Sequence, residues 1–371
     1  MFSNLKYASR SIVYWKTVHQ ETGMGTHALS VSVILRSWEI SGSKRSRLYG
    51  VGMIKSLAKQ LPHPFLCRLY HQVHLREESS RAAKAASRTG LPLLKSLDLR
   101  RLRTSETLFI LGSAWSINDI SDERWRIISQ HDSVGFNFWL AHPFVPRMFV
   151  FESAAYHDHP VMYDAFRPLL ERRAGVYANT MKIITDVRPL GPRQMIFELP
   201  EGIKENLYVG YTTPVIARNE EELEAGIRYM RSIGAFTPGP GVAWLFKYGG
   251  SVIAMMSLAV LMGHKRIILC GIDLGKQDYF YHHRERYPDY AGWEFAPRKD
   301  NHLTTRRLEW MVPAHSVIRI YKQQVLDPAG IELFVESRAS TLYPGIPLAT
   351  DSLFEELALQ PLNNSDSTSH R

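Results

Sequence analysis

The stretch Thr107-Leu108-Phe109-Ile110-Leu111-Gly112-Ser113-Ala114-Trp115-Ser116-Ile117-Asn118 decides the fold class. It begins with apolar and β-branched residues, as a buried strand does, and small polar residues follow from Gly112. Ser116 or Asn118 can cap a following helix, whose N-terminus attracts anions through its free backbone N–H groups and its dipole. The stretch indicates either a nucleotide-phosphate loop or the ordinary first turn of an α/β sheet. With only one glycine, it has no dinucleotide-binding fingerprint.

Apolar runs and amphipathic segments alternate from Thr107 onwards. Continuous apolar strands between helices predict an α/β, Rossmann-like fold, with a mostly parallel sheet and helices on both faces. The expected strands are 107–111, 133–137, 148–152, 182–185, 195–199, 207–209, 266–271 and 332–335, and the expected helices are 119–129, 161–171, 220–233, 251–262 and 316–325. Ligands in such sheets bind beyond the carboxyl ends of the strands.

The charge is unevenly distributed along the chain. Residues 1–104 hold 18 Lys and Arg against 5 Asp and Glu, whereas the remainder holds 27 against 31. We expect a basic, partly helical N-terminal segment over 1–104, an α/β domain over 105–345 and a C-terminal tail over 346–371. The basic segment suits an anionic membrane surface, or, as a weaker alternative, nucleic acid. A solvated helical arm is the simpler interpretation.

Composition indicates a soluble globular protein. No apolar run approaches the roughly 20 residues that span a bilayer, and basic residues interrupt the N-terminus where a secretory signal would be apolar. The two cysteines, Cys67 and Cys270, give no disulfide framework, and Cys270 lies in an apolar strand pattern. We expect a cytoplasmic protein, with the inner face of the membrane as a second location. The oligomeric state stays open.

Two expected strands end in polar residues. Asn137 carries an amide that can both donate to and accept from a nucleobase or ribose. Glu152 carries a carboxylate that can accept from the hydroxyls of ribose or of another sugar. Either residue can equally be an ordinary turn or surface residue.

A second strand-and-turn unit follows a glycine pair. Gly249, Gly250 and Ser251 precede the apolar helix, and Ser251 is a plausible N-cap. The glycines allow a ligand to approach the backbone closely, and the helix start can hold a phosphate or carboxylate. The next strand ends in Gly271-Ile272-Asp273, which places Asp273 at the carboxyl edge of the sheet.

Residues 275–315 have little apolar periodicity, as expected for an active-site lid. They are rich in tyrosine, histidine and arginine, including Tyr279, Tyr281, His282, His283, Arg284, Arg286, His302 and His315. His282 and His283 are adjacent, and no cysteine or spaced carboxylate set completes a ligand pattern, so we expect no metal.

These motifs resemble those of the bacterial sialyltransferases of glycosyltransferase family 42. In that family a Gly-Asn-Gly-Pro-Ser turn follows the first strand, an Asn ends the second, and a Ser-led helix runs into a Gly-Ile-Asp strand end. The matching stretches are Gly112–Ser116, Asn137 and Ser251 through Asp273, and the resemblance covers roughly residues 105–345. The first turn departs from the family, because Ser113-Ala114-Trp115 replaces Asn-Gly-Pro, and Trp115 would crowd the loop.

The resemblance implies an inverting, metal-independent and cofactor-free transferase. Such an enzyme moves sialic acid, or a related nonulosonic acid, from a CMP-activated donor to a glycan acceptor in surface polysaccharide synthesis. A lid histidine activates the acceptor, and lid tyrosines assist the departure of CMP. By position, His315 is the expected base with His302 as the alternative, and Tyr281 is the expected tyrosine with Tyr279 nearby. The residues expected to bind the donor are Gly112, Ser113, Ser116, Asn137, Glu152, Gly250, Ser251, Gly271 and Asp273.

Two other functions stay open. Proteins resembling archaeal pterin pyrophosphokinases and motility-associated glycosyltransferases share the early turn and the Gly-x-Asp strand end. A phosphoryl or pyrophosphoryl transferase on this sheet would need a divalent metal, with Asp273 or Glu152 as ligands. The altered first turn also fits a non-catalytic protein that binds a glycan or a partner.

Overall fold

The computed structural model describes residues 63–153, 156, 160–187, 193–275, 278–288 and 311–360. The chain divides into two units, Met1–Leu69 and Tyr70–Arg371, and almost all described residues belong to the second. In the described residues, none of the helices combines the length and apolar character needed to cross a bilayer.

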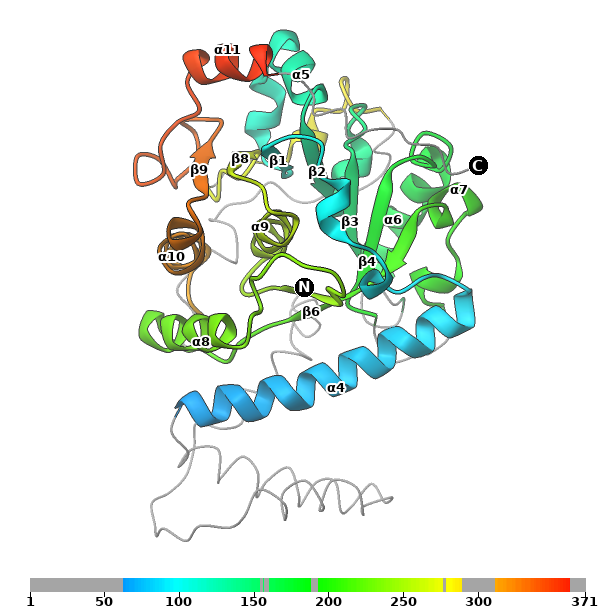
Figure 1. Cartoon of the computed structure of the whole chain (residues 1–371). Helices are drawn as coiled ribbons and strands as arrows, with labels where there is room; N and C mark the ends of the chain where they lie inside the picture. The colour runs from blue at the N-terminus through cyan, green and yellow to red at the C-terminus, as the bar shows by residue number, and fades with distance from the viewer. Residues whose placement is uncertain are drawn as a thin grey trace, which may run out of the picture. The chain divides into compact units, whose positions relative to one another are not determined.

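The second unit is built on a seven-stranded sheet in which every pairing is parallel. The strand order is β5-β4-β3-β2-β1-β8-β9. The strands are β1 (Thr107–Leu111), β2 (Asp132–Phe136), β3 (Met148–Glu152), β4 (Met181–Thr185), β5 (Leu207–Val209), β8 (Arg266–Cys270) and β9 (Glu332–Val335). Figure 1 shows the sheet with helices around it, which confirms the predicted α/β fold with a mostly parallel sheet.

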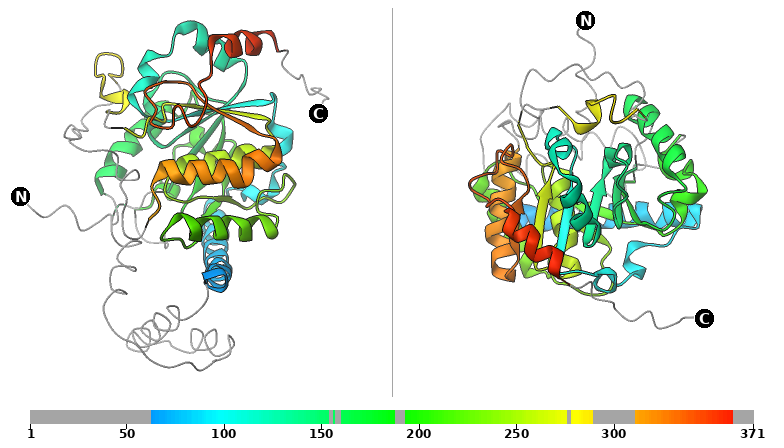
Figure 2. Two further views of the ribbon diagram at one scale, coloured as in Figure 1. Left: turned by 90° about the vertical axis from the view of Figure 1, so that its left-hand side faces the viewer. Right: turned by 90° about the horizontal axis from the view of Figure 1, so that it is seen from above.

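Both faces of the sheet are buried. In β1, Leu108 and Ile110 belong to one apolar core, whereas Phe109 and Leu111 belong to the other. The first core is covered by α8 (Glu220–Ser232), α9 (Ser251–Met262) and α10 (Ala314–Tyr321), and the second by α5 (Asp122–Ser129), α6 (Pro160–Arg173) and α11 (Asp351–Leu359). The left view of Figure 2 shows α8 and α10 on one side of the sheet and α5 and α11 on the other. This two-sided burial explains why the strands are continuous apolar runs.

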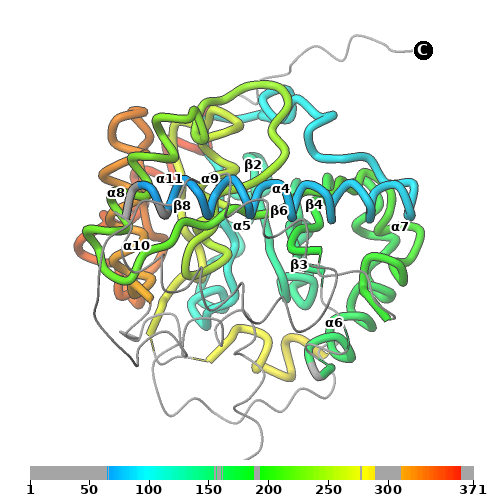
Figure 3. The backbone as a smooth tube through the Cα atoms, turned by 90° about the horizontal axis from the view of Figure 1, so that it is seen from below, coloured from blue at the N-terminus to red at the C-terminus, as the bar shows by residue number. Residues whose placement is uncertain are grey.

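A second, two-stranded parallel sheet pairs β6 (Tyr211–Thr213) with β7 (Trp244–Phe246). The helix α4 (His63–Thr89) passes beside it from Tyr70 onwards, as Figure 3 shows. His74 Nε2 lies 3.1 Å from the carbonyl oxygen of Thr212, and the His71 ring packs edge-on against Trp244. Neither strand was among those predicted from the sequence.

Several predicted boundaries differ from the structure. The expected strand at 195–199 is a 3₁₀ turn over Met195–Phe197, because a short apolar run buries its side chains equally well from a turn. The expected helix at 119–129 is a 3₁₀ turn followed by α5, which Ser121 caps by accepting the N–H of Arg124. The helix expected at 316–325 begins at Ala314 and continues as a π-helical turn over Lys322–Leu326.

The remaining short elements connect these layers. They are α7 (Glu201–Lys204) and 3₁₀ turns at Leu94–Ser96, Leu99–Leu102, Trp115–Asp119, Asn137–Ala141, Phe280–His282 and Asp327–Ala329.

The core extends beyond the expected 105–345 domain at both ends. Leu94 and Leu99 are fully buried, and the carboxylate of Asp132 accepts the backbone N–H groups of Thr104 and Ser105. At the other end, Phe354 and Leu357 of α11 pack into the second core. The α/β unit therefore includes residues that composition had assigned to the basic segment and to the tail. Residues 1–62 and 361–371 lie outside the described residues.

Candidate functional site

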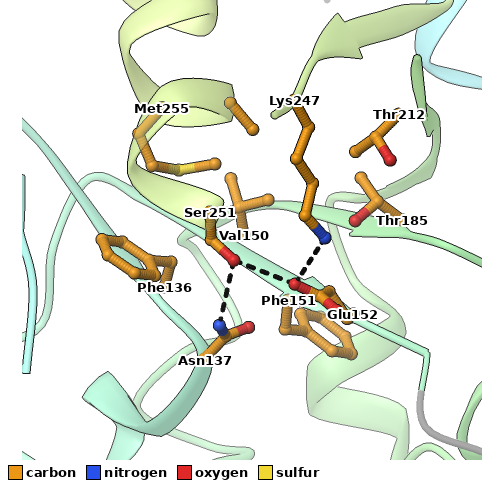
Figure 4. Close-up of a pocket in the computed structure, with 11 residues that line it drawn as sticks. Phe136, Asn137, Val150, Phe151, Glu152, Thr185, Thr212, Lys247, Ser251 and Met255 are labelled. Carbon is orange, nitrogen blue, oxygen red and sulfur yellow. Dashed lines mark hydrogen bonds and ion pairs between the residues drawn. The ribbon is translucent and has the colours of Figure 1, made fainter. Parts of the chain in front are cut away.

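A pocket lies at the carboxyl ends of β2, β3 and β4, next to the start of α9 (Figure 4). This is the edge at which ligands bind in open α/β sheets. Its lining combines apolar side chains with a few polar groups, and its cavity volume of about 10 Å³ is that of about one water molecule. The lining residues are Phe136, Asn137, Val150, Phe151, Glu152, Thr185, Thr212, Lys247, Ser251, Ala254 and Met255.

Three of the predicted donor-site residues meet in this pocket. Asn137, Ser251 and Glu152 form one hydrogen-bonded row, which Figure 4 shows from end to end. Asn137 Nδ2 lies 3.4 Å from Ser251 Oγ, and Ser251 Oγ lies 2.9 Å from Glu152 Oε1. Ser251 follows Asn137 by 114 positions and Glu152 by 99 positions in the chain. The three side chains meet because α9 begins at the edge where the parallel strands end.

Lys247 adds a cation that the sequence prediction missed. It directly follows β7, and its Nζ lies 2.8 Å from Glu152 Oε1 and 2.7 Å from Asp186 Oδ2. Burial alone lowers the pKa of the Lys247 ammonium, but the carboxylates of Asp186 and Glu152 outweigh burial and raise it above its usual value. Lys247 is therefore charged, and two carboxylates with one ammonium leave this polar group with one net negative charge.

Asp186 follows β4 and was also missed. Its second carboxylate oxygen accepts the hydroxyl of Thr212, so it links the main sheet to the small sheet. Lys247 directly follows β7 and Asp186 directly follows β4, and Asn137 and Glu152 were predicted from the same strand-end position. That signal was present in the sequence, but their pairing depends on how the two sheets meet.

Two pocket residues have left-handed backbone conformations. Asn137 has φ 52° and Asp186 has φ 54°, each just after its strand. Asn and Asp are the residues other than glycine that adopt this region most readily, yet the conformation still carries a cost. Backbone strain of this kind is common at functional sites. Arg193, Asn206 and Leu274 share the conformation outside the pocket, so it does not by itself identify the site.

The start of α9 differs from the prediction in one detail. Gly250 is the N-cap residue, without a side-chain cap, and Ser251 is the first helical residue. The expected N-cap role of Ser251 is therefore wrong, because its hydroxyl binds Glu152 instead of the helix backbone. Gly249 has φ 72°, which favours glycine, and a Cβ placed on Gly250 would have no neighbour within 4 Å. A ligand could thus approach the backbone at this point.

The first turn forms a separate, closed cluster with the end of β8. Ser116 N lies 3.2 Å from Asp273 Oδ2, and Ser116 Oγ lies 2.6 Å from Asp273 Oδ1. Both residues are buried, at 1% and 2% exposure. Burial raises the pKa of the Asp273 carboxyl, with Asp119 adding to the rise, while the bonds from Ser116 oppose it. The Asp273 carboxylate thus accepts the backbone N–H of Ser116 that an anion bound at this turn would need.

Close packing explains the two glycines of this cluster. A Cβ on Gly112 would lie 2.4 Å from the carbonyl oxygen of Gly271, and Gly271 has φ 64°. The Ser113 carbonyl accepts the N–H of Phe280, and Trp115 stacks on His283 at 5.9 Å between ring centroids. The structure therefore places Gly112, Ser113, Ser116, Gly271 and Asp273 in tertiary contacts outside the pocket.

The expected tyrosines lie beside this closed cluster. Tyr279 pairs with Ala114 in a single antiparallel bridge and stacks on Tyr281 at 4.9 Å between centroids. Tyr281 is 2% exposed and packs near Phe138 in the second core. Neither tyrosine lines the pocket. The expected lid is described only over 278–288 and from residue 311.

Of the two expected bases, His315 lies in the described part of the chain, and it does not line the pocket. His315 is exposed in the first turn of α10, and it is one of the groups that lower the pKa of Glu220, after Ser316 and Arg319. The nearest link to the site is indirect, since Val312 and Val317 lie against Gly249. His302 lies outside the described residues.

No group of three or more histidine, cysteine, aspartate or glutamate side chains in the described residues is arranged to hold a metal ion. Both cysteines are buried, and Cys270 lies in the core as expected.

Comparison of the chain with protein-family models, curated proteins and solved structures found no match.

Proposed function

We propose that the protein is a nucleotide-sugar-dependent glycosyltransferase and that its donor nucleotide binds in the pocket. The donor class is a CMP-activated sialic acid or related nonulosonic acid, and the acceptor is a glycan hydroxyl. The observation that carries the proposal is the hydrogen-bonded row of Asn137, Ser251 and Glu152 at the carboxyl edge of a parallel sheet. The resemblance to family 42 covers Asn137 and Ser251, and the strand-end position of Glu152 predicts it for the same site.

The pocket offers distinct chemistry for the parts of such a donor. Asn137 and Glu152 suit the nucleoside, because they can bond to base or ribose groups. The backbone at Gly250, with open space beside it, suits a phosphate or carboxylate approaching the start of α9. Lys247 already supplies positive charge between Glu152 and Asp186, so we expect donor binding without a divalent ion.

The chemical step is assigned by resemblance to residues of the expected lid. In this proposal His315, or His302, takes the proton of the acceptor hydroxyl, and Tyr281 or Tyr279 donates to the departing phosphate. Because Tyr281 is buried against aromatic rings, its substitution needs a stability control. Tyr281→Phe keeps the ring, so a loss of transfer at unchanged stability would support a role for the hydroxyl.

Thermal unfolding with a nucleotide panel tests the proposal. The panel is CMP, CDP, UDP, GDP and ATP, each with magnesium and with EDTA. A ligand at 100 times its dissociation constant adds roughly 2.7 kcal/mol to the free energy of unfolding. We expect CMP to raise the unfolding temperature equally in both conditions.

A phosphoryl transferase is the second candidate, favoured by the two carboxylates that flank Lys247. A divalent ion could displace the ammonium and bind Glu152 and Asp186. A magnesium-dependent shift with ATP would support this alternative, whereas no shift with any nucleotide would support a non-catalytic, glycan- or partner-binding protein.

The proposed partners and location follow from the donor. We propose a cytoplasmic enzyme that reaches an anionic membrane through its basic N-terminal segment, without a nucleic-acid partner. Residues 1–104 carry most of the excess positive charge of the chain. Binding to anionic vesicles that weakens as salt rises would support this proposal.

A further inference from the structure

The row in the pocket has a fixed hydrogen-bond direction. An ionised carboxylate can only accept, so the single proton of the Ser251 hydroxyl goes to Glu152 Oε1. Ser251 Oγ can then only accept from Asn137, which means that the amide NH₂ of Asn137 faces Ser251. Lys247 donates to the same Glu152 oxygen. The orientation of the Asn137 amide thus follows from the charge of Glu152.

This direction decides which atoms are left for a ligand. Glu152 Oε1 already receives two donors, whereas Glu152 Oε2 and Asn137 Oδ1 have no hydrogen-bonding partner in the part of the chain that the structure describes. Both atoms are acceptors, and the second N–H of the Asn137 amide remains as a donor beside them. The Glu152 side chain is 39% exposed, so its second oxygen is within reach of a ligand.

The charge of the pocket points to the same ligand chemistry. Glu152 and Asp186 carry two negative charges and Lys247 one positive charge. Two acceptors in a negative environment repel a phosphate or a carboxylate and favour neutral hydrogen-bond donors. Neighbouring hydroxyl groups on a sugar ring are such donors, and a strand-end carboxylate binds ribose hydroxyls in other α/β nucleotide sites.

We propose that Glu152 Oε2 and Asn137 Oδ1 bind the vicinal hydroxyls of the donor's ribose, so that this row selects ribonucleotides over deoxyribonucleotides. The inference rests on the proposed function and deepens it, because it assigns the row to the ribose and excludes the anionic groups from it. The phosphate then lies away from Glu152, towards the backbone at Gly250.

Calorimetric titration of the full chain tests this inference. The ligands are CMP, 2′-deoxy-CMP and free N-acetylneuraminic acid, all in EDTA. A carboxylate that loses its hydroxyl partner forfeits a charge-assisted bond, so we expect 2′-deoxy-CMP to bind at least about tenfold more weakly than CMP. This comparison uses the natural chain, so it does not depend on how any variant folds.

The variant Glu152→Gln tests whether the row of Asn137, Ser251 and Glu152 causes the difference in affinity between CMP and 2′-deoxy-CMP. We expect this variant to bind CMP and 2′-deoxy-CMP within about twofold of each other, because a glutamine amide can turn its NH₂ towards the ligand. Glu355→Gln is the matched control, since Glu355 is exposed on α11, and it should keep the full discrimination.

Each remaining outcome is decisive. Equal binding of CMP and 2′-deoxy-CMP by the natural chain would overturn the inference and leave the proposed function intact. Failure of every nucleotide to bind would overturn both. Binding of N-acetylneuraminic acid that requires Glu152, with CMP binding that does not, would assign the row to the sugar and overturn the ribose assignment.

Discussion

Lys247 sets the charge balance of the candidate site, because it is the cation shared by Glu152 and Asp186. Each of these three side chains is partly exposed, at 21%, 39% and 20% respectively. Removing one member of a fully buried ion pair typically costs 3–5 kcal/mol, and solvent screening reduces that cost here.

We therefore expect Lys247→Met to lower the free energy of unfolding by about 1–3 kcal/mol, since two carboxylates would repel each other. Urea denaturation at pH 7 measures the change. The double variant Lys247→Met with Asp186→Asn removes that repulsion and should recover part of the loss. If Lys247→Met unfolded at the same urea concentration as the natural chain, the charge balance described here would be wrong.

His142 is a second residue with a measurable consequence, outside the pocket. Burial, followed by the positive charges of Arg286 and Arg173, lowers its pKa from 6.5 to about 3. Its Nδ1 accepts the backbone N–H of Phe144, and its ring stacks on Trp139. Folding thus keeps this histidine neutral in mildly acidic solution.

Between pH 6.5 and 3 the unfolded chain binds a proton at His142 that the folded chain does not, so stability falls as the pH falls. At pH 5 the loss relative to pH 7 is roughly 2 kcal/mol from this group. His142→Asn keeps a hydrogen-bond acceptor without the titration. We expect its urea midpoint to fall less between pH 7 and pH 5 than that of the natural chain, and an equal fall would count against the assignment.

At the scale of elements, the first β–turn–helix unit acts as a structural joint between β1 and β8. The Ser116–Asp273 pair and the glycine contact between Gly112 and Gly271 close the carboxyl ends of the two strands. The pocket uses instead the ends of β2, β3 and β4 with the start of α9. Substitutions in this joint should therefore change mainly the free energy of unfolding, and substitutions in the pocket mainly CMP affinity.

We expect Ser116→Ala to lower the free energy of unfolding by about 1–3 kcal/mol, because Asp273 loses a buried hydroxyl donor. CMP affinity should change by less than about twofold. Ser251→Ala is the matched control and should show the reverse, with weaker CMP binding and a smaller stability change. Loss of CMP affinity in Ser116→Ala at unchanged stability would place the nucleotide at the first turn after all.

The sequence predicted the elements of this unit better than their connections. Apolar runs of five residues identified β1, β3 and β8 because both faces of the sheet are buried. The three-residue strands β6 and β7 were not predicted, although β5, of the same length, was. Strand-end position identified Asn137 and Glu152. The same rule selected Asp273, whose carboxylate instead accepts a hydrogen bond from Ser116. Only tertiary contacts show whether a polar side chain at a strand end is already hydrogen-bonded within the protein.

At the scale of the whole molecule, the α/β unit depends on residues that precede its first strand. Leu94 and Leu99 are fully buried in the first core, and Leu93 pairs with Val209 beside β5. The sequence analysis assigned these residues to the basic segment, because that part of the chain is rich in Lys and Arg and its buried apolar residues are few.

We expect a chain that starts at residue 105 to lose cooperative unfolding. It would lack Leu94 and Leu99, each worth about 2–3 kcal/mol of burial, as well as the contacts of α4 with the small sheet. Far-UV circular dichroism during heating, compared with the full chain, measures this. An unchanged midpoint would show that residues before 105 contribute nothing to the core.

The central claim is that the row of Asn137, Ser251 and Glu152 binds a donor nucleotide. The most direct test is calorimetric titration of CMP into the full chain in EDTA, repeated with Glu152→Gln and with the control Glu355→Gln. We expect saturable, metal-independent binding that Glu152→Gln weakens at least about tenfold and Glu355→Gln leaves unchanged. Absence of CMP binding, or binding that Glu152→Gln does not alter, would contradict it.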